Sequence, residues 1–293
     1  MIFSIFARSL RTTLQQKKMM SLLWAISFLF AFPGFWITHR TLNSYFGGRQ
    51  VAGEWLHQFN LSYLLEMIND LPSLIPATNA LFFGSALLFL VVTIFLTGGI
   101  VGKLIQAVSG DSSNGEGFAP SFFSLSGKFF FRILRVFLWT TLLSLVSFAF
   151  MMIGGYAGLI TAALIAVWIM TSDITKIRLV SDDSGKVTKT YFSSFIWVMK
   201  NIPSVALVYL LNFFLLVMTF ALYKFLDNAL IANGILKIFL MVVIHQMFVF
   251  FRGAIRIQMF TSAILLWHAK LKTMASVASN PSENLLDEQT QPA

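Results

Sequence analysis

The chain has 293 residues, of which 57% are hydrophobic and only 11% are charged, whereas about 25% of the residues in ordinary soluble domains are charged. This composition excludes a soluble globular protein and indicates an integral membrane protein. Cysteine is absent, which excludes disulfides, thiol nucleophiles and thiolate metal sites. The net charge of +9 does not by itself indicate nucleic acid, because basic residues in a multi-spanning protein first set its orientation in the bilayer.

Long uncharged runs predict six transmembrane helices, because a helix needs about 20 mainly apolar residues to cross the hydrocarbon core. The third and fourth helices come from one run that is too long for a single span and is interrupted by Gly154 and Gly155, which predict a tight hairpin. The sixth span has a short uncharged core, so it crosses only if Arg252, with or without Arg256, lies in or near the inner leaflet. The predicted spans are residues 19–38, 77–102, 129–153, 156–175, 203–223 and 235–257.

These spans predict an all-α polytopic membrane helix bundle. Residues 1–272 are expected to form a single transmembrane domain, and the polar residues 273–293 a disordered cytoplasmic tail. The basic, amphipathic first 18 residues share features with a mitochondrial presequence. The apolar run that follows them is too long for a cleaved signal peptide, which favours an uncleaved signal anchor.

The distribution of Lys and Arg predicts the orientation of the spans. With the N-terminus in the cytoplasm, the outer segments contain only four of the 21 basic residues, namely Arg40, Arg49, Lys224 and Lys237. Both termini are therefore predicted to be cytoplasmic. The basic character of the chain is explained by this asymmetry, and no nucleic-acid partner is expected.

Short aromatic and basic stretches precede the first, third and fifth spans, as IFSIFARSLRTTLQQKK, FAPSFFSLSGKFFFRILR and TYFSSFIWVMKN. In the first stretch, Phe3, Phe6, Leu10 and Leu14 recur at helical spacing, which is typical of an amphipathic helix lying in the membrane interface. Three such interfacial helices are predicted on the cytoplasmic side. Within the outer segment 39–76, the stretch VAGEWLHQFNLSYLLEMINDL predicts another amphipathic helix, which lies on the outer surface or caps the bundle, with partner binding as an alternative role.

The even-numbered spans also end alike. Thr97-Gly98-Gly99-Ile100 in the second span aligns with Thr171-Ser172-Asp173-Ile174 in the fourth, and each run reaches a glycine after a further segment of acid and serine. The pattern favours a threefold repeat of interfacial helix plus transmembrane hairpin. Convergent chemistry at the membrane border is the alternative explanation.

The stretch DITKIRLVSDD is followed by an amphipathic basic segment and a proline before the fifth span, and HQMFVFFRGAIRIQMFTSAILLW lies in the sixth. Through these features most of the chain resembles a group of bacterial six-helix integral membrane proteins without an assigned function. More loosely, its architecture is similar to the membrane domain joined to some glycerophosphodiester phosphodiesterases, but the phosphodiesterase domain itself does not occur here. The resemblance implies a fold and a bacterial inner (cytoplasmic) membrane, and no activity.

Charged side chains at predicted membrane depth form the first candidate site, since inserting one costs roughly 2.5–3.5 kcal/mol and suggests pairing or function. Asp173 could pair with an arginine and leave others facing a polar cavity that binds a lipid phosphate, because guanidinium groups match phosphate bidentately. The alternatives are arginines that snorkel to the interface beside an Asp173 that ends its helix, and a structural ion pair. The residues of this cluster are Arg132, Arg135, Asp173, Arg252 and Arg256.

A second candidate site consists of polar residues near the middle of the last two spans, namely Asn212, His245 and Gln246. Such residues line proton or substrate paths in some membrane proteins, but a hydrogen bond between helices is the commoner outcome.

The sequence contains no HExxH, no GxSxG and no Walker loop. We therefore expect a non-enzymatic protein, without cofactor or metal, that binds membrane lipids or another membrane protein as an accessory or scaffold subunit. A small-molecule or lipid transporter with a path between the repeats is the alternative. An enzyme would require a clustered acid and base that the sequence does not reveal.

Overall fold

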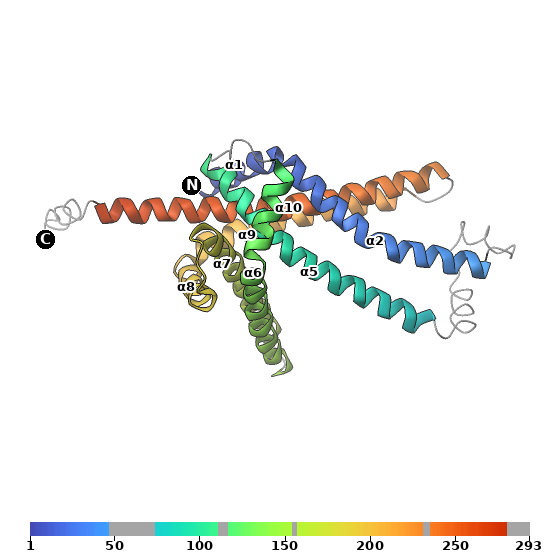
Figure 1. The fold of residues 1–293 in the computed structure, drawn as a ribbon, viewed down its shortest axis with the longest axis horizontal. Coiled ribbons are helices and arrows are strands. Elements are labelled where there is room, and N and C mark those ends of the chain that lie inside the picture. Colours follow the sequence, from blue (N-terminus) through green and yellow to red (C-terminus); the bar gives the residue numbers. More distant parts are fainter. Residues whose placement is uncertain (47–73, 111–116, 154–156, 231–234, 280–293) are drawn as a thin grey trace. The chain divides into compact units, whose positions relative to one another are not determined.

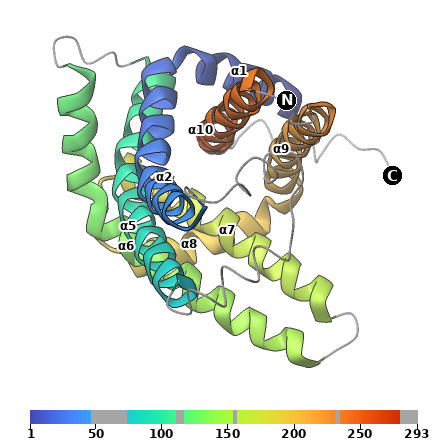
Figure 2. The same ribbon diagram turned by 90° about the vertical axis from the view of Figure 1, so that its right-hand side faces the viewer.

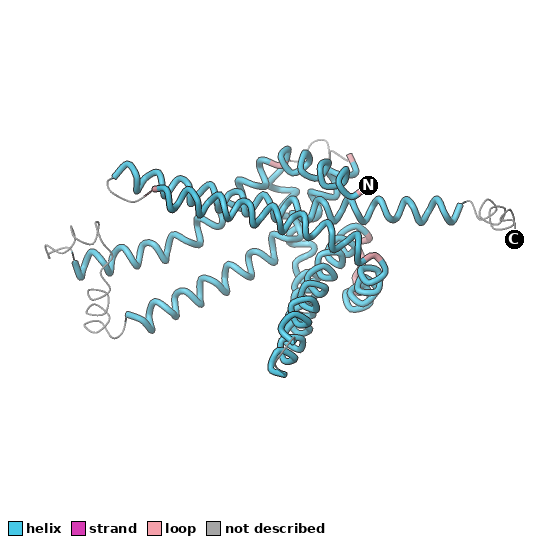
Figure 3. The backbone as a smooth tube through the Cα atoms, turned by 180° about the vertical axis from the view of Figure 1, so that it is seen from behind, coloured by secondary structure: helices cyan, strands magenta, loops and turns pink. Residues whose placement is uncertain are grey.

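A computed structural model describes residues 1–46, 74–110, 117–153, 157–230 and 235–279. All regular structure in these ranges is helical (Figure 3), which confirms the predicted all-α class. The helices, labelled in Figure 1, are α1 (Ile2–Gln15), α2 (Lys17–Phe46), α5 (Leu74–Ser109), α6 (Phe118–Ala149), α7 (Ala157–Ser181), α8 (Val187–Lys200), α9 (Ile202–Ala229) and α10 (Ile235–Ser279), and a short 3-10 helix, η1 (Phe150–Ile153), follows α6.

Six of these helices, α2, α5, α6, α7, α9 and α10, are long and apolar enough to cross a membrane, as predicted. Their outer faces carry large apolar side chains with little cover. For example, Phe83 and Leu159 are 77% and 73% exposed. Apolar surface of this extent is uncommon on soluble monomers and suits contact with lipid chains.

Several helix boundaries differ from the sequence-based expectation, and most of the long helices extend beyond the predicted spans. The stretch before the third span is not a separate interfacial helix but the start of α6, because no helix-breaking residue separates Lys128 from Arg135. Helix α10 passes the predicted end of the sixth span without a break, and residues 273–279 of the predicted tail are helical. The predicted outer amphipathic helix, the hairpin glycines and residues 280–293 lie outside the described residues.

The stretches before the first and fifth spans do form separate helices, α1 and α8. The break after α8 falls at Asn201, two residues before Pro203, whose ring nitrogen cannot donate a backbone hydrogen bond. Helix α1 leaves Phe3, Leu10 and Leu14 exposed, at 70%, 39% and 58%. Its placement in the membrane interface remains a prediction.

The chain divides into two compact units. Unit 1 consists of residues 1–15, 97–212 and 258–293, and unit 2 of residues 16–96 and 213–257. Within unit 2, Trp24 donates a hydrogen bond to Gln246 at 3.1 Å, and the rings of Phe30 and Phe89 meet edge to face at 5.4 Å. Unit 1 contains α1, α6, α7 and α8 together with parts of α5, α9 and α10.

Within unit 1, α6 and α7 run side by side as the predicted hairpin (Figure 2). Helix α5 approaches the start of α6 closely through glycines. A Cβ added at Gly99 would lie 2.7 Å from the backbone oxygen of Phe122, and one at Gly98 would lie 3.2 Å from that of Leu125. The close approach therefore requires these glycines and fixes the end of α5 against α6.

The two aligned tetrapeptides, 97–100 and 171–174, are both buried in unit 1. A third, Thr261-Ser262-Ala263-Ile264 in α10, shares their Thr-small-x-Ile pattern and is buried as well. The fully buried Ser126 of α6 lies against Gly99 of the first tetrapeptide. Two other fully buried serines bond to residues a few positions from the second and third tetrapeptides, Ser194 to Arg178 and Ser9 to Gln258. The third tetrapeptide was missed at the sequence level.

Candidate functional site

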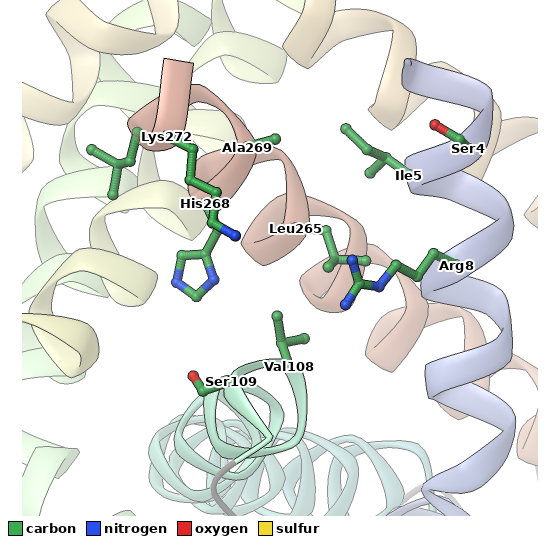
Figure 4. A pocket seen from close by; sticks show the side chains of 10 residues that line it. Ser4, Ile5, Arg8, Val108, Ser109, Leu265, His268, Ala269 and Lys272 are labelled. Atoms are coloured by element: carbon green, nitrogen blue, oxygen red, sulfur yellow. The ribbon is translucent and has the colours of Figure 1, made fainter. Parts of the chain in front are cut away.

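A pocket in unit 1 lies between α1, the end of α5 and the last part of α10 and has a volume of about 670 Å³ (Figure 4). Arg8 comes from α1, and His268 and Lys272 come from α10. We call it the basic pocket, and its lining residues are Ser4, Ile5, Arg8, Val108, Ser109, Leu265, His268, Ala269, Leu271 and Lys272.

A buried amide holds α1 on α10 and so positions Arg8. Gln258, only 1% exposed, accepts a hydrogen bond from Thr13 at 2.9 Å and donates one to the hydroxyl of Ser9 at 2.8 Å. Thr13 and Ser9 lie on the same face of α1 as Ile5, because these positions are spaced four residues apart. The apolar Phe3, Leu10 and Leu14 are thus left on other faces of α1.

The face of α10 that binds α1 continues into the pocket. From Gln258, the positions of Leu265 and Lys272 follow at seven-residue steps, which keeps them on one side of the helix. Gln258 contacts Ser9 and Thr13, whereas Leu265 and Lys272 share the pocket with Ser4 and Arg8. The two helices therefore run antiparallel, and Arg8 and Lys272 approach the pocket from different helices.

The charge of the basic pocket is one-sided. Arg8 and Lys272 are exposed and His268 is partly buried, while none of the described lining residues is acidic. Within the described part of the chain, neither Arg8 nor Lys272 forms an ion pair. Hydroxyls of Ser4 and Ser109 and apolar groups of Leu265 and Val108 complete the lining. This combination suits an anionic group attached to an apolar body.

The predicted arginine cluster around Asp173 does not form within unit 1. Arg132 instead pairs with Asp183, in the turn after α7, at 2.6 Å, and Lys128 pairs with the same carboxylate at 2.8 Å. These hydrogen bonds, from Lys128 first and Arg132 second, lower the pKa of Asp183 below its usual value. Arg135 is exposed and lies beside Trp139 in a small surface hollow on α6.

Asp173 is buried, with 6% of its side chain exposed, and its ionic partner is a lysine on its own helix. Lys176 contacts one carboxylate oxygen at 2.9 Å, and the hydroxyl of Tyr209, from α9, donates to the other at 3.0 Å. The structural ion pair considered from the sequence is therefore present, with Lys176 in place of an arginine. Arg252 and Arg256 belong to unit 2, where both are exposed.

The predicted polar cluster of the last two spans is divided between the units. In unit 1, the Asn212 side-chain amide donates to the hydroxyl of Ser262 at 3.1 Å and to the backbone oxygen of Val208 at 2.8 Å. In unit 2, His245 lies 3.4 Å from the hydroxyl of Tyr223, and Gln246 accepts from Trp24. Hydrogen bonds between helices thus occupy Asn212 and Gln246, the commoner outcome for such residues.

Sequence reasoning missed the basic pocket. Arg8 lies in the first amphipathic stretch, IFSIFARSLRTTLQQKK, and Lys272 lies at the end of the predicted transmembrane domain, but no motif in the sequence links the two. The missing information was the register of α1 on α10, which depends on Gln258, Ser9 and Thr13 meeting across almost the whole length of the chain.

The fold and the exposed apolar faces of its six long helices define a multi-pass integral membrane protein. Comparison of the chain with family models, with curated proteins and with solved structures finds no match.

Proposed function

We propose that this membrane protein is non-enzymatic and binds the phosphate-bearing head group of an anionic phospholipid in the basic pocket. The observation that carries the proposal is the convergence of Arg8, His268 and Lys272 from two helices on one pocket, with no acidic residue among its described lining. Guanidinium and ammonium groups bind phosphate oxygens through charge-assisted hydrogen bonds. An anionic head group supplies the charge that the pocket itself lacks.

The expected orientation supports a lipid as the source of that phosphate. Arg8 and Lys272 belong to segments predicted on the cytoplasmic side, and anionic lipids of that leaflet attract basic residues by about 1 kcal/mol per Lys or Arg. The apolar side chains of Val108, Leu265 and Leu271 provide contacts that a free phosphate ion would not use. The role that follows is an accessory or scaffold subunit of the bacterial inner membrane that recognises its lipid surroundings.

The proposal is tested with the purified full-length chain in a neutral detergent, by titrating phosphatidylglycerol, phosphatidylcholine and inorganic phosphate and measuring binding by native mass spectrometry. We expect phosphatidylglycerol to bind at least tenfold more tightly than the other two probes. The double variant R8A/K272A should weaken that binding roughly twentyfold or more, since each charge is worth about 1 kcal/mol.

The matched control is R11A/K270A, which removes the same two charge types from the same two helices at positions that do not line the pocket. Equal loss in both double variants would show that surface charge alone attracts the lipid and would contradict the proposal. Phosphate binding as tight as that of phosphatidylglycerol would assign the pocket to a soluble anion.

The transporter alternative requires a path that joins Asn212 with His245. Asn212 belongs to unit 1 and His245 to unit 2, and the contacts of each residue are described within its own unit. The path therefore stays a prediction, and the proposal does not depend on it.

A further inference from the structure

A second cavity, of about 460 Å³, lies between the two helices of the α6–α7 hairpin. Because the helices are antiparallel, its lining separates into two ends. Asp173 and Lys176 of α7 lie at one end with Thr140 of α6, and Leu145 and Phe148 of α6 lie at the other with Ile165 of α7. The cavity is thus polar at one end and apolar at the other, as an amphiphile is.

The polar end carries both a carboxylate and an ammonium group. Asp173 receives Lys176 on one oxygen and the Tyr209 hydroxyl on the other, so the carboxylate keeps further acceptor capacity. Lys176 uses one N–H on Asp173 and lies 5.8 Å from the ring of Phe260. The polar end therefore has no net charge but presents one group of each sign.

The packing of unit 1 does not require an acid at this position. In the two tetrapeptides that share the Thr-small-x-Ile pattern, the place of Asp173 is taken by Gly99 and Ala263, which are buried without charge. Burying a carboxylate and an ammonium group costs several kcal/mol per ion before their attraction is counted. Within the described residues, the tetrapeptide that contains the acid also lines this cavity, so the charged pair lies where a ligand could use it.

The whole cavity, with its polar end included, has about the length of one leaflet of hydrocarbon. From Phe137 to Phe148, the α6 lining extends about 16 Å at 1.5 Å per residue, which is roughly half of the 30 Å hydrocarbon core. Along it, the hydroxyls of Thr141 and Ser144 have no hydrogen-bond partner within the described residues and face the cavity. They are free to bond to the ester region of a lipid.

We propose that the hairpin cavity binds a zwitterionic phospholipid whose head group carries a primary ammonium, with that ammonium on Asp173, the phosphate on Lys176 and one acyl chain along the apolar end. A primary ammonium donates hydrogen bonds to a carboxylate, whereas the quaternary ammonium of a choline lipid cannot. A net-neutral site also does not favour a net-anionic lipid. This site is independent of the basic pocket in both its residues and its ligand.

The test uses the full-length chain in neutral detergent, titrated separately with phosphatidylethanolamine, phosphatidylcholine and phosphatidylglycerol under native mass spectrometry. We expect phosphatidylethanolamine to bind at least tenfold more tightly than phosphatidylcholine. S144L, which fills the cavity and leaves the ion pair intact, should weaken phosphatidylethanolamine binding at least tenfold. D173N should bring the two zwitterionic lipids to equal affinity.

The matched control for S144L is V146L, at an exposed position of α6 that does not line the cavity. Because S144L keeps both charges, it remains informative if D173N does not fold. Equal binding of the two zwitterionic lipids to the unmodified chain would overturn the head-group assignment, and unchanged binding in S144L would overturn the site. Phosphatidylglycerol binding should be unaffected by S144L and reduced by R8A/K272A, so the two proposals fail separately.

Discussion

At the scale of single residues, Asp173 and Asp183, two of the aspartates near the end of α7, have contrasting environments. Asp173 is buried and held by Lys176 and Tyr209, while the side chain of Asp183 is 53% exposed and is held by Lys128 and Arg132 from α6. Asp183 also has a positive φ of 45°, a conformation that Asp and Asn tolerate better than most residues. Its ion pairs therefore connect a turn of unusual backbone conformation to the neighbouring helix.

We predict that this connection weakens in acid. The pKa of Asp183 is lowered in the folded protein by its bonds to Lys128 and Arg132. The stabilisation is therefore fully present above the usual Asp pKa of about 3.9 and is lost as the pH falls through the lower folded-state value. In the unmodified chain, amide hydrogen exchange of the turn, corrected for its intrinsic rate, should accelerate as the pH falls through the folded-state pKa of Asp183.

The control is D183N, which keeps a residue tolerant of positive φ and removes the titrating group. Its turn should exchange at one corrected rate over the whole acidic range in which the turn of the unmodified chain accelerates. A matching acceleration in D183N would assign the acid effect to another group.

At the scale of elements, the packing of α5 requires glycine near its C-terminal end but not in its earlier part. Gly99 faces the backbone oxygen of Phe122, whereas Gly84, in the same helix, has no atom within 4 Å of an added Cβ. Both glycines lie in one apolar run, and nothing in the composition around them distinguishes the two. Their difference arises only from what packs against each.

We predict that Gly99→Ala destabilises the protein by about 1–3 kcal/mol, since an added methyl group would overlap a backbone atom that cannot rotate away. Gly84→Ala is the control and should be neutral or slightly stabilising, because alanine has the higher helix propensity. The free energy of unfolding in mixed detergent measures both. Equal destabilisation by the two variants would mean that the contact of α5 with α6 is not tight.

At the scale of the whole molecule, the basic residues predict how the helices cross the membrane. The segments assigned to the outer side contain four of the 21 Lys and Arg residues, an asymmetry that follows the positive-inside rule. The rule predicts which ends of the helices face the cytoplasm. The packing of the helices against one another does not give this information.

A reporter fused after residue 293 should therefore be active in the cytoplasm, and one inserted near Gly48 should be outside. The measurement is the activity of paired reporters that function on only one side of the membrane. The reverse result would contradict the predicted topology and would also remove the argument that the basic pocket faces the inner leaflet.

Three buried tetrapeptides support the hypothesis of a threefold repeat that the sequence favours. Sequence reasoning aligned only two of them, because the third has Ala263 where the others have Gly99 or Asp173, and four short residues carry little signal. Burial in the same unit makes the third recognisable. Whether duplication produced them stays a proposal.

The sequence by itself determined the all-α class and the six long apolar helices, because crossing hydrocarbon imposes a length and a composition that can be counted locally. The sequence also showed that only a few charged residues lie at the predicted depth of the membrane. Only the tertiary structure decided that Asp173 pairs with Lys176, that Arg132 pairs with Asp183, and that Arg8 and Lys272 share a pocket. These pairings depend on helix register and close approach, which are set by contacts between residues far apart in the chain.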